Sequence, residues 1–208
     1  MFSRVSTMKK TANFSFACPY VSMHEPMKPI PSNENHWYKH KYLTDLAERG
    51  YSPVDFKMWL YQGHYQAERD FSFEQLAAAH ARMMNYRNFA ALRWQGVEKS
   101  DFADVRAEMM ECLNSNMNSA GAFAALDGAA KSGVAPSDDF LKFIDDAFGL
   151  EIAANSMDIS EDLKAKIAER VEAKATKDYA RADALRDEIA EEGIELLDSA
   201  NGVKWQYK

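Results

Sequence analysis

The stretch TKDYARADALRDEIAEEGIEL, residues 176–196, contains a change of period that decides the architecture at this end of the chain. At about 100° per residue, one side of a helix collects the apolar residues Ala182, Leu185 and Ile189. Gly193 then fits the left-handed position that ends a helix, and a strand pattern starts directly after it. We therefore predict a helix that ends at Gly193 and is followed at once by a β-strand.

The neighbouring residues extend this stretch into a small unit. Residues 159–176 have the pattern of a preceding helix. Two strand patterns, 194–199 and 203–208, are joined through Ala-Asn-Gly, and Asn-Gly is a strong hairpin signal. We predict a C-terminal unit over residues 156–208, two helices and a β-hairpin, in which Trp205 packs the hairpin onto the helix pair.

Upstream of this unit the sequence has the pattern of a helical bundle with short loops. Ser52 followed by Pro53 is a strong helix start, because serine caps a helix and proline fits its first turn. Ser72 with Gln75 predicts a capping box at the start of the longest helix. Serines before further helical runs predict N-caps at Ser100, Ser119 and Ser137.

The predicted fold class is therefore mainly α: a helical bundle over residues 39–150, followed by two helices and a C-terminal β-hairpin. Residues 1–38 show no sustained period and contain closely spaced prolines, so we predict an irregular N-terminal segment. We also expect residues 150–159, LEIAANSMDI, to form an exposed linker between the bundle and the C-terminal unit.

The composition narrows the classes of function. Of 208 residues, 47% are hydrophobic and 27% are charged, as in an ordinary globular protein. No apolar run is long enough to span a bilayer, and the N-terminus lacks the continuous apolar segment of a secretory signal. Two cysteines cannot form a disulfide framework for a chain of this size. We expect a cytoplasmic protein with no membrane partner.

The net charge of −7 argues against a protein that binds nucleic acid through bulk positive charge. A few well-placed groups can still recognise a base. Tyr179, Asp183 and Arg186 share one helix face, where an aromatic ring can stack and the charged groups can bind base edges. Lys174 and Asp198 can join them. The alternative is a solvated face on which Asp183 and Arg186 form an ion pair.

Two stretches carry a resemblance to a known family. EAKATKDYARADALRDEIAEEGIELLDSANGVKWQYK, residues 172–208, resembles the C-terminal end of bacterial cysteinyl-tRNA synthetases. Its Lys-Asp-aromatic, Ala-x-Ala-Asp-x-x-Arg-Asp, Gly-Ile-x-Leu-x-Asp and Gly-x-x-Trp elements follow the family's order without a gap. Residues 42–88 resemble the segment after the family's catalytic domain, including the His64-Tyr65 pair. The resemblance covers about residues 40–208.

The resemblance implies that the bundle contacts the inner side of a tRNA and that the C-terminal unit binds the anticodon of tRNA-Cys. Lysine replaces a forked donor with a point charge, and the family often has arginine at the position of Lys174 and tryptophan at that of Tyr179. We therefore expect weaker discrimination at the base facing the lysine. A monomer is expected. The residues that match anticodon-facing positions are Lys174, Tyr179, Asp183, Arg186 and Asp198.

The family's catalytic signatures do not occur in this sequence. His-x-Gly-His and Lys-Met-Ser-Lys-Ser, its two ATP-handling motifs, are both missing. We therefore expect no catalytic residue and no metal site in this chain, with ATP and zinc bound only by a catalytic domain. Cys18, His24 and Glu25 lack a second soft ligand and would make a poor zinc site.

Three functions stay open. The chain can be the RNA-binding part of a split or truncated synthetase, with a separate catalytic chain supplying the chemistry. It can be a free-standing tRNA-binding module, or a protein-interaction module that has lost RNA binding. We expect tRNA-Cys binding that supports cysteine–tRNA ligation only with a catalytic domain, and no activation of cysteine by this chain alone.

Overall fold

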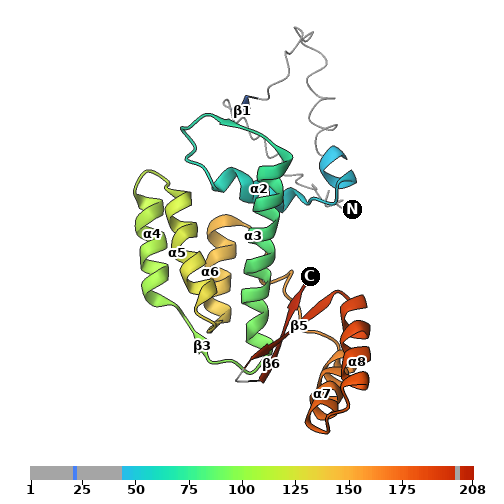
Figure 1. Cartoon of the computed structure of the whole chain (residues 1–208). Helices are drawn as coiled ribbons and strands as arrows, with labels where there is room; N and C mark the ends of the chain where they lie inside the picture. The colour runs from blue at the N-terminus through green and yellow to red at the C-terminus, as the bar shows by residue number, and fades with distance from the viewer. Residues whose placement is uncertain (1–20, 23–43, 200–201) are drawn as a thin grey trace, which may run out of the picture.

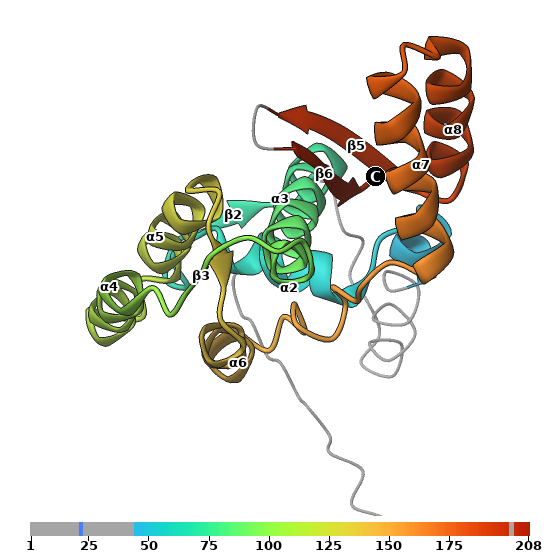
Figure 2. The same cartoon turned by 90° about the horizontal axis from the view of Figure 1, so that it is seen from below.

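The computed structural model describes residues 21–22, 44–199 and 202–208, and it is mainly α, as predicted (Figure 1). Seen from below (Figure 2), the long helix α3 (Phe73–Ala91) lies in the middle, with most of the other bundle helices on one side and the C-terminal unit on the other. Nearly all of the N-terminal segment 1–38, with its zinc candidates Cys18, His24 and Glu25, lies outside the described residues.

Short helices and small parallel strand pairs complete the bundle. Residues 44–48 are helical, and a 3-10 turn, η1 (Leu92–Trp94), follows α3. The strand pairs are β1 (Val21–Ser22) with β2 (Arg69–Asp70) and β3 (Lys99–Ser100) with β4 (Ala135–Pro136). The remaining helices are α2 (Pro53–Tyr61), α4 (Ala103–Asn114), α5 (Ser119–Lys131) and α6 (Asp138–Phe148).

Three of the five predicted serine caps are confirmed. The side chains of Ser52, Ser72 and Ser137 each accept a hydrogen bond from the first turn of a helix. The prediction is wrong for α4, which is preceded by Phe102 in the left-handed conformation, with no side-chain cap. It is also wrong for α5, because Asn118 accepts the capping bond and the serine after it is already helical.

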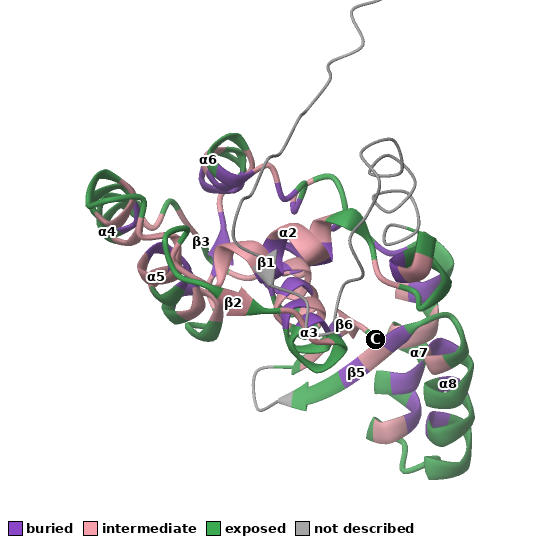
Figure 3. Ribbon diagram, turned by 90° about the horizontal axis from the view of Figure 1, so that it is seen from above, coloured by how far each residue is buried: buried purple, intermediate pink, exposed green. Residues whose placement is uncertain are grey.

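Buried positions of the bundle helices face inward around α3 (Figure 3). A polar network and a buried tryptophan organise this core. Trp59 of α2 donates its indole N–H to Gln75 at 3.0 Å, so that side chain does not close the predicted capping box. Tyr86 is buried and donates its hydroxyl to Asp127 of α5 at 2.6 Å. Arg82 donates to the same carboxylate at 2.7 Å. These bonds tie α3 to α5 inside the bundle.

The C-terminal unit has the predicted order of elements: α7 (Glu161–Ala175), α8 (Tyr179–Glu191), β5 (Ile194–Ser199) and β6 (Gly202–Tyr207). Gly193 has a φ of 81°, the left-handed conformation predicted for it. The strands are antiparallel, with Leu196 opposite Trp205, and the connecting residues 200–201 lie outside the described part. Trp205 is 7% exposed and packs with apolar residues of α7 and α8, as predicted.

Residues 150–159, which the sequence predicts to be an exposed linker, are only partly exposed. Leu150 and Ile152 are buried in the bundle core, and Ile159 joins the apolar cluster of the C-terminal unit. Asp145 accepts the backbone N–H groups of Ile152 and Ala153 at 2.8 and 3.0 Å. The apolar residues of this segment have no helical or strand period, so their packing could not be predicted from the sequence.

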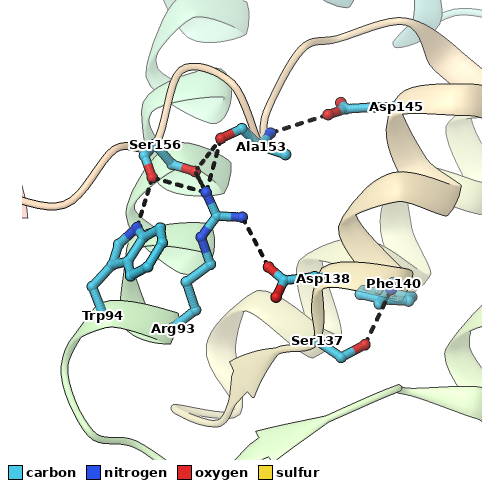
Figure 4. Close-up of polar contacts among 8 residues, drawn as sticks. All are labelled: Arg93, Trp94, Ser137, Asp138, Phe140, Asp145, Ala153 and Ser156. Carbon is cyan, nitrogen blue, oxygen red and sulfur yellow. Dashed lines mark hydrogen bonds and ion pairs between the residues drawn. The ribbon is translucent and has the colours of Figure 1, made fainter.

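Arg93 binds residues 150–159 through hydrogen bonds to their backbone (Figure 4). Its guanidinium donates to the carbonyl oxygens of Ala153 at 2.9 Å and Ser156 at 3.1 Å, and to Asp138 of α6 at 3.3 Å. The indole N–H of Trp94 also donates to the Ser156 carbonyl, at 2.9 Å. The segment therefore holds the two parts of the chain together.

Candidate RNA-binding face

Helix α8 is built so that one side is buried and the adjoining side is free. Asp178 caps it by accepting the backbone N–H of Arg181 at 3.1 Å. The predicted apolar stripe is confirmed, since 2% or less of each of its residues is exposed: Ala182, Leu185 and Ile189. Because this stripe fixes the rotation of the helix, it also fixes which side chains face outward.

Tyr179, Asp183 and Arg186 face outward beside this stripe, and 61% of Tyr179 is exposed. Within the described residues, none of the three side chains makes a hydrogen bond or an ion pair. Acidic and basic residues three apart commonly pair on helices, but the Asp183–Arg186 pair of an ordinary solvated face is not formed. By contrast, Arg181 on the opposite side of α8 donates to Glu169 of α7 at 2.9 Å.

The other two predicted site residues, Lys174 and Asp198, meet between α7 and β5. Lys174 Nζ donates to Asp198 Oδ2 at 2.6 Å. Arg170 donates through both of its terminal nitrogens to the two Asp198 oxygens, at 3.0 and 3.1 Å. The hydrogen bonds from Arg170 and then Lys174 hold the pKa of Asp198 well below its usual range. The carboxylate is therefore ionised, while 46% of its side chain stays accessible.

The predicted residues gather toward one end of the helix pair. Lys166 in the first half of α7 forms an ion pair with Glu188 in the last turn of α8, so the two helices run antiparallel. Lys174 lies in the last turn of α7 and Tyr179 opens α8, which places both where the chain turns. The bond to Lys174 brings Asp198 to the same end. Asp183 and Arg186 follow along α8, about one and two turns from its start.

Sequence reasoning missed Arg170. Only 2% of this residue is exposed, and its position on α7 follows the buried Leu163 and half-buried Ile167 at helical spacing. An arginine in the line of an apolar stripe was the available signal, because charged side chains are rarely buried without a partner. Asp198 is the acceptor that makes this burial possible.

The free edge of β6 is bound by two side-chain amides of the bundle. Asn88 of α3 accepts the N–H of Tyr207 at 2.8 Å and donates to its carbonyl at 3.3 Å. Gln95, just after η1, accepts the N–H of Trp205 at 3.1 Å and donates to its carbonyl at 2.9 Å. The two amides thus bind backbone groups of β6 as a neighbouring strand would. They hold the hairpin, and with it helix α8, against the bundle.

Other site classes receive no support from the described residues. In this part of the chain no group of three or more His, Cys, Asp or Glu residues is arranged to hold a metal ion. None of its helices combines the length and apolar character needed to cross a membrane.

Comparison with known proteins finds relatives among the cysteine–tRNA ligases. The chain is 33% identical over 175 residues to the enzyme of Hydrogenovibrio crunogenus, 30% over 193 residues to that of Solibacter usitatus, and 29% over 191 residues to that of Bacteroides fragilis. The matches cover 75%, 80% and 80% of this chain, but 37%, 41% and 38% of the relatives. No family model matches the chain.

The chain is therefore homologous to cysteine–tRNA ligases, and it spans well under half the length of these relatives. The partial coverage is consistent with the C-terminal part of the enzyme, the part to which the quoted motifs point. The resemblance found in the sequence is confirmed.

Proposed function

We propose that this homologue of the C-terminal part of cysteine–tRNA ligases binds tRNA-Cys and reads its anticodon with the outward face of α8. Tyr179 would stack on an unpaired base, Asp183 would accept from amino or imino groups, and Arg186 would donate to paired acceptors. Lys174 and Asp198 would complete the face at the turn between the helices. The bundle would lie along the body of the same tRNA.

One observation carries this proposal most directly. Asp183 and Arg186 lie at a spacing that favours an ion pair, yet neither has a partner among the described residues, and Tyr179 beside them is 61% exposed. On the other side of α8, by contrast, Arg181 pairs with Glu169 of α7, and Glu188 pairs with Lys166 of α7. An unsatisfied donor, acceptor and ring on one rigid helix are what an RNA base requires.

A binding titration tests the proposal. Wild type and the variants Tyr179→Ala, Asp183→Ala and Arg186→Ala are titrated against tRNA-Cys and an anticodon-swapped tRNA at one fixed salt concentration, because affinity for RNA depends on salt. Loss of the ring should weaken binding of both RNAs by about 1–3 kcal/mol. Loss of Asp183 or Arg186 should cost about 1–3 kcal/mol, mainly for tRNA-Cys.

Arg181→Ala is the matched control, because it removes an exposed arginine from the same helix on the side that binds α7. Its affinity for both RNAs should equal that of wild type. Equal affinities for all five proteins would mean that α8 is an ordinary solvated helix. The chain would then be better explained as a protein-interaction module with no role in aminoacylation.

Ligation itself would need a catalytic domain, in this protein or in a separate chain, and that domain would bind ATP and zinc. The present 208 residues contain neither ATP signature. They should therefore show no cysteine-dependent pyrophosphate exchange, and clear exchange by this chain alone would contradict the assignment. As a translation component it would work in the cytoplasm, and we propose that it does so as a monomer.

A further inference from the structure

The contact between Arg170 and Asp198 is unusual for a structural ion pair. Arg170 is 2% exposed, and both of its terminal nitrogens are committed to one carboxylate. Its third donor, Nε, is buried and has no acceptor within the described residues. The guanidinium thus depends on Asp198 alone for compensation of its lost hydration.

Stability alone does not explain an arginine at this position. Removing a guanidinium from water costs several kcal/mol, and apolar residues of similar volume often serve equally well or better in such places. Residue 170 continues the apolar line of Leu163 and Ile167 on α7, where a methionine or leucine would fit the same packing. The fork geometry of the arginine, in contrast, fixes the plane and rotation of a carboxylate.

The carboxylate that Arg170 fixes is itself at the surface. Asp198 follows the buried Ile194 and Leu196 on the same side of β5, and 46% of its side chain is accessible. Two bonds from Arg170 and one from Lys174 leave part of its acceptor capacity unused, since a carboxylate offers about four lone-pair positions. Lys174 Nζ keeps further N–H donors, and 38% of its side chain is accessible.

We propose that Arg170 is a positioning residue of the RNA-binding face: it fixes the Asp198 carboxylate and, through it, the Lys174 ammonium as an adjacent acceptor and donor for the edge of an unpaired base. Such an edge carries neighbouring donor and acceptor atoms, which an adjacent ammonium and carboxylate complement. Arg170 does not touch the RNA. This inference rests on the proposed function and adds a residue that prepares the site.

The proposal is tested with Arg170→Met, Arg170→Lys, Asp198→Asn and the double variant Arg170→Met/Asp198→Asn. The quantity measured is the ratio of the affinities for tRNA-Cys and the anticodon-swapped tRNA. Each single variant should lower this ratio about tenfold, the lower part of the range for one edge contact. The double variant should lose no more than either single variant, because two residues that act through one contact are not additive.

Arg170→Lys separates charge from geometry. It keeps a cation beside Asp198 but loses the fork, so the ratio should fall although the total charge is unchanged. Thermal unfolding of each variant shows that it is folded at the temperature of the titration. A role confined to stability would lower the melting temperature and reduce both affinities equally, leaving the ratio as in wild type.

A nuclear magnetic resonance titration of the Asp198 carboxyl carbon, without RNA, gives an independent readout. In wild type the pKa of this carboxyl should lie well below the usual range for aspartate. In Arg170→Met the pKa should be closer to that of an ordinary aspartate. The charged groups facing it are Arg170 and Lys174 of α7, and its partner across the hairpin is Val203.

The outcomes are distinguishable. If wild type does not discriminate between the two tRNAs, the proposed function fails. If wild type discriminates and Asp198→Asn does not, but Arg170→Met and Arg170→Lys both retain the wild-type ratio, the positioning role is overturned while the proposed function stands.

Discussion

Gln95 holds Trp205 by both of its backbone groups, with Oε1 accepting the N–H at 3.1 Å and Nε2 donating to the carbonyl at 2.9 Å. Asn88 does the same for Tyr207 two residues further along β6. The outer edge of β6, which has no neighbouring strand within the described residues, is thus bound by these two side chains. These hydrogen bonds, in addition to the covalent connection, hold the C-terminal unit against the bundle.

Replacing these amides should loosen β6 selectively. Asn88→Leu and Gln95→Leu each remove the two hydrogen bonds to β6, and Gln95→Leu also removes a longer one to the Ala91 carbonyl. The edge can be reached by water, so the cost should be about 0.5–1.5 kcal/mol per lost bond at most. Hydrogen exchange should become faster at the N–H of Tyr207 in the first variant and of Trp205 in the second. Gln206→Ala, which loses only a bond to Glu195 across the hairpin, is the control. Unchanged exchange rates at both positions would show that Asn88 and Gln95 do not hold the edge of β6.

The acid stability of the protein should depend on Asp198. Its pKa is lowered in the folded chain, by Arg170 first and then Lys174, whereas in the unfolded chain it titrates near 4. The stabilisation is therefore complete above about pH 4 and is lost as the pH falls below that value toward the folded pKa. Unfolding measured from pH 5 to pH 2 should show a steeper loss for wild type than for Asp198→Asn. Parallel curves would contradict this assignment.

Tyr86 should stabilise the bundle through its hydroxyl. Burial raises its pKa, and the hydrogen bond to Asp127 raises it further. Tyr86→Phe should lower the free energy of unfolding by about 1–3 kcal/mol at neutral pH, because the hydroxyl both donates to Asp127 and accepts from Arg82. Because the folded pKa lies above the unfolded value near 10, this contribution is full below pH 10 and declines as the pH rises beyond it.

The control for Tyr86 is Tyr65→Phe, which removes the hydroxyl of a tyrosine that is 57% exposed and binds Asn116 at the surface. Denaturant unfolding should show a change within about 0.5 kcal/mol for this variant. If both variants changed the free energy of unfolding by the same small amount, the buried hydrogen bonds of Tyr86 would not stabilise the bundle more than a surface hydrogen bond does.

Arg93 should protect residues 150–159 from proteases. Arg93→Ala removes the donors that bind the carbonyls of Ala153 and Ser156, so this segment should detach and become the first site of cleavage. In wild type, cleavage there should be slow. Lys142→Ala breaks only an exposed pair with Asp146 and should leave the cleavage pattern unchanged. Rapid cleavage of wild type within 150–159 would show instead that this segment behaves as an exposed linker.

The sequence predicted the elements whose signals are local. Ser52 with Pro53, Gly193 and the apolar stripe of α8 each depend on residues within a few positions, and the structure confirms them. The starts of α4 and α5 were wrong because the Ser100 hydroxyl accepts the N–H of Phe102, ahead of α4, and because Asn118 accepts the capping bond of α5 in place of Ser119. Local preference alone does not decide between neighbouring candidates.

The candidate site was predictable only in part for a related reason. The outward positions of Tyr179 and Asp183 follow from helical period, but the pairing of Lys174 with Asp198 depends on how β5 returns along α7. Asn88 and Gln95 act through contacts across the fold that no spacing in the sequence reveals. The spacing on α7 indicates that Arg170 is buried, but it does not reveal Asp198 as its partner. Whether the five predicted residues bind an anticodon is still a prediction.

The bonds from Asn88 and Gln95 to β6 join residues 119 and 110 positions apart, which has a kinetic consequence. Neighbouring helices such as α4 and α5 meet through short loops and can form early, whereas contacts over such separations reward the chain only after the intervening structure exists. Docking of the hairpin is therefore expected to be the last step of folding. By the same reasoning its release should be the first step of unfolding, so the unit that would bind the anticodon is the part that docks last and is released first.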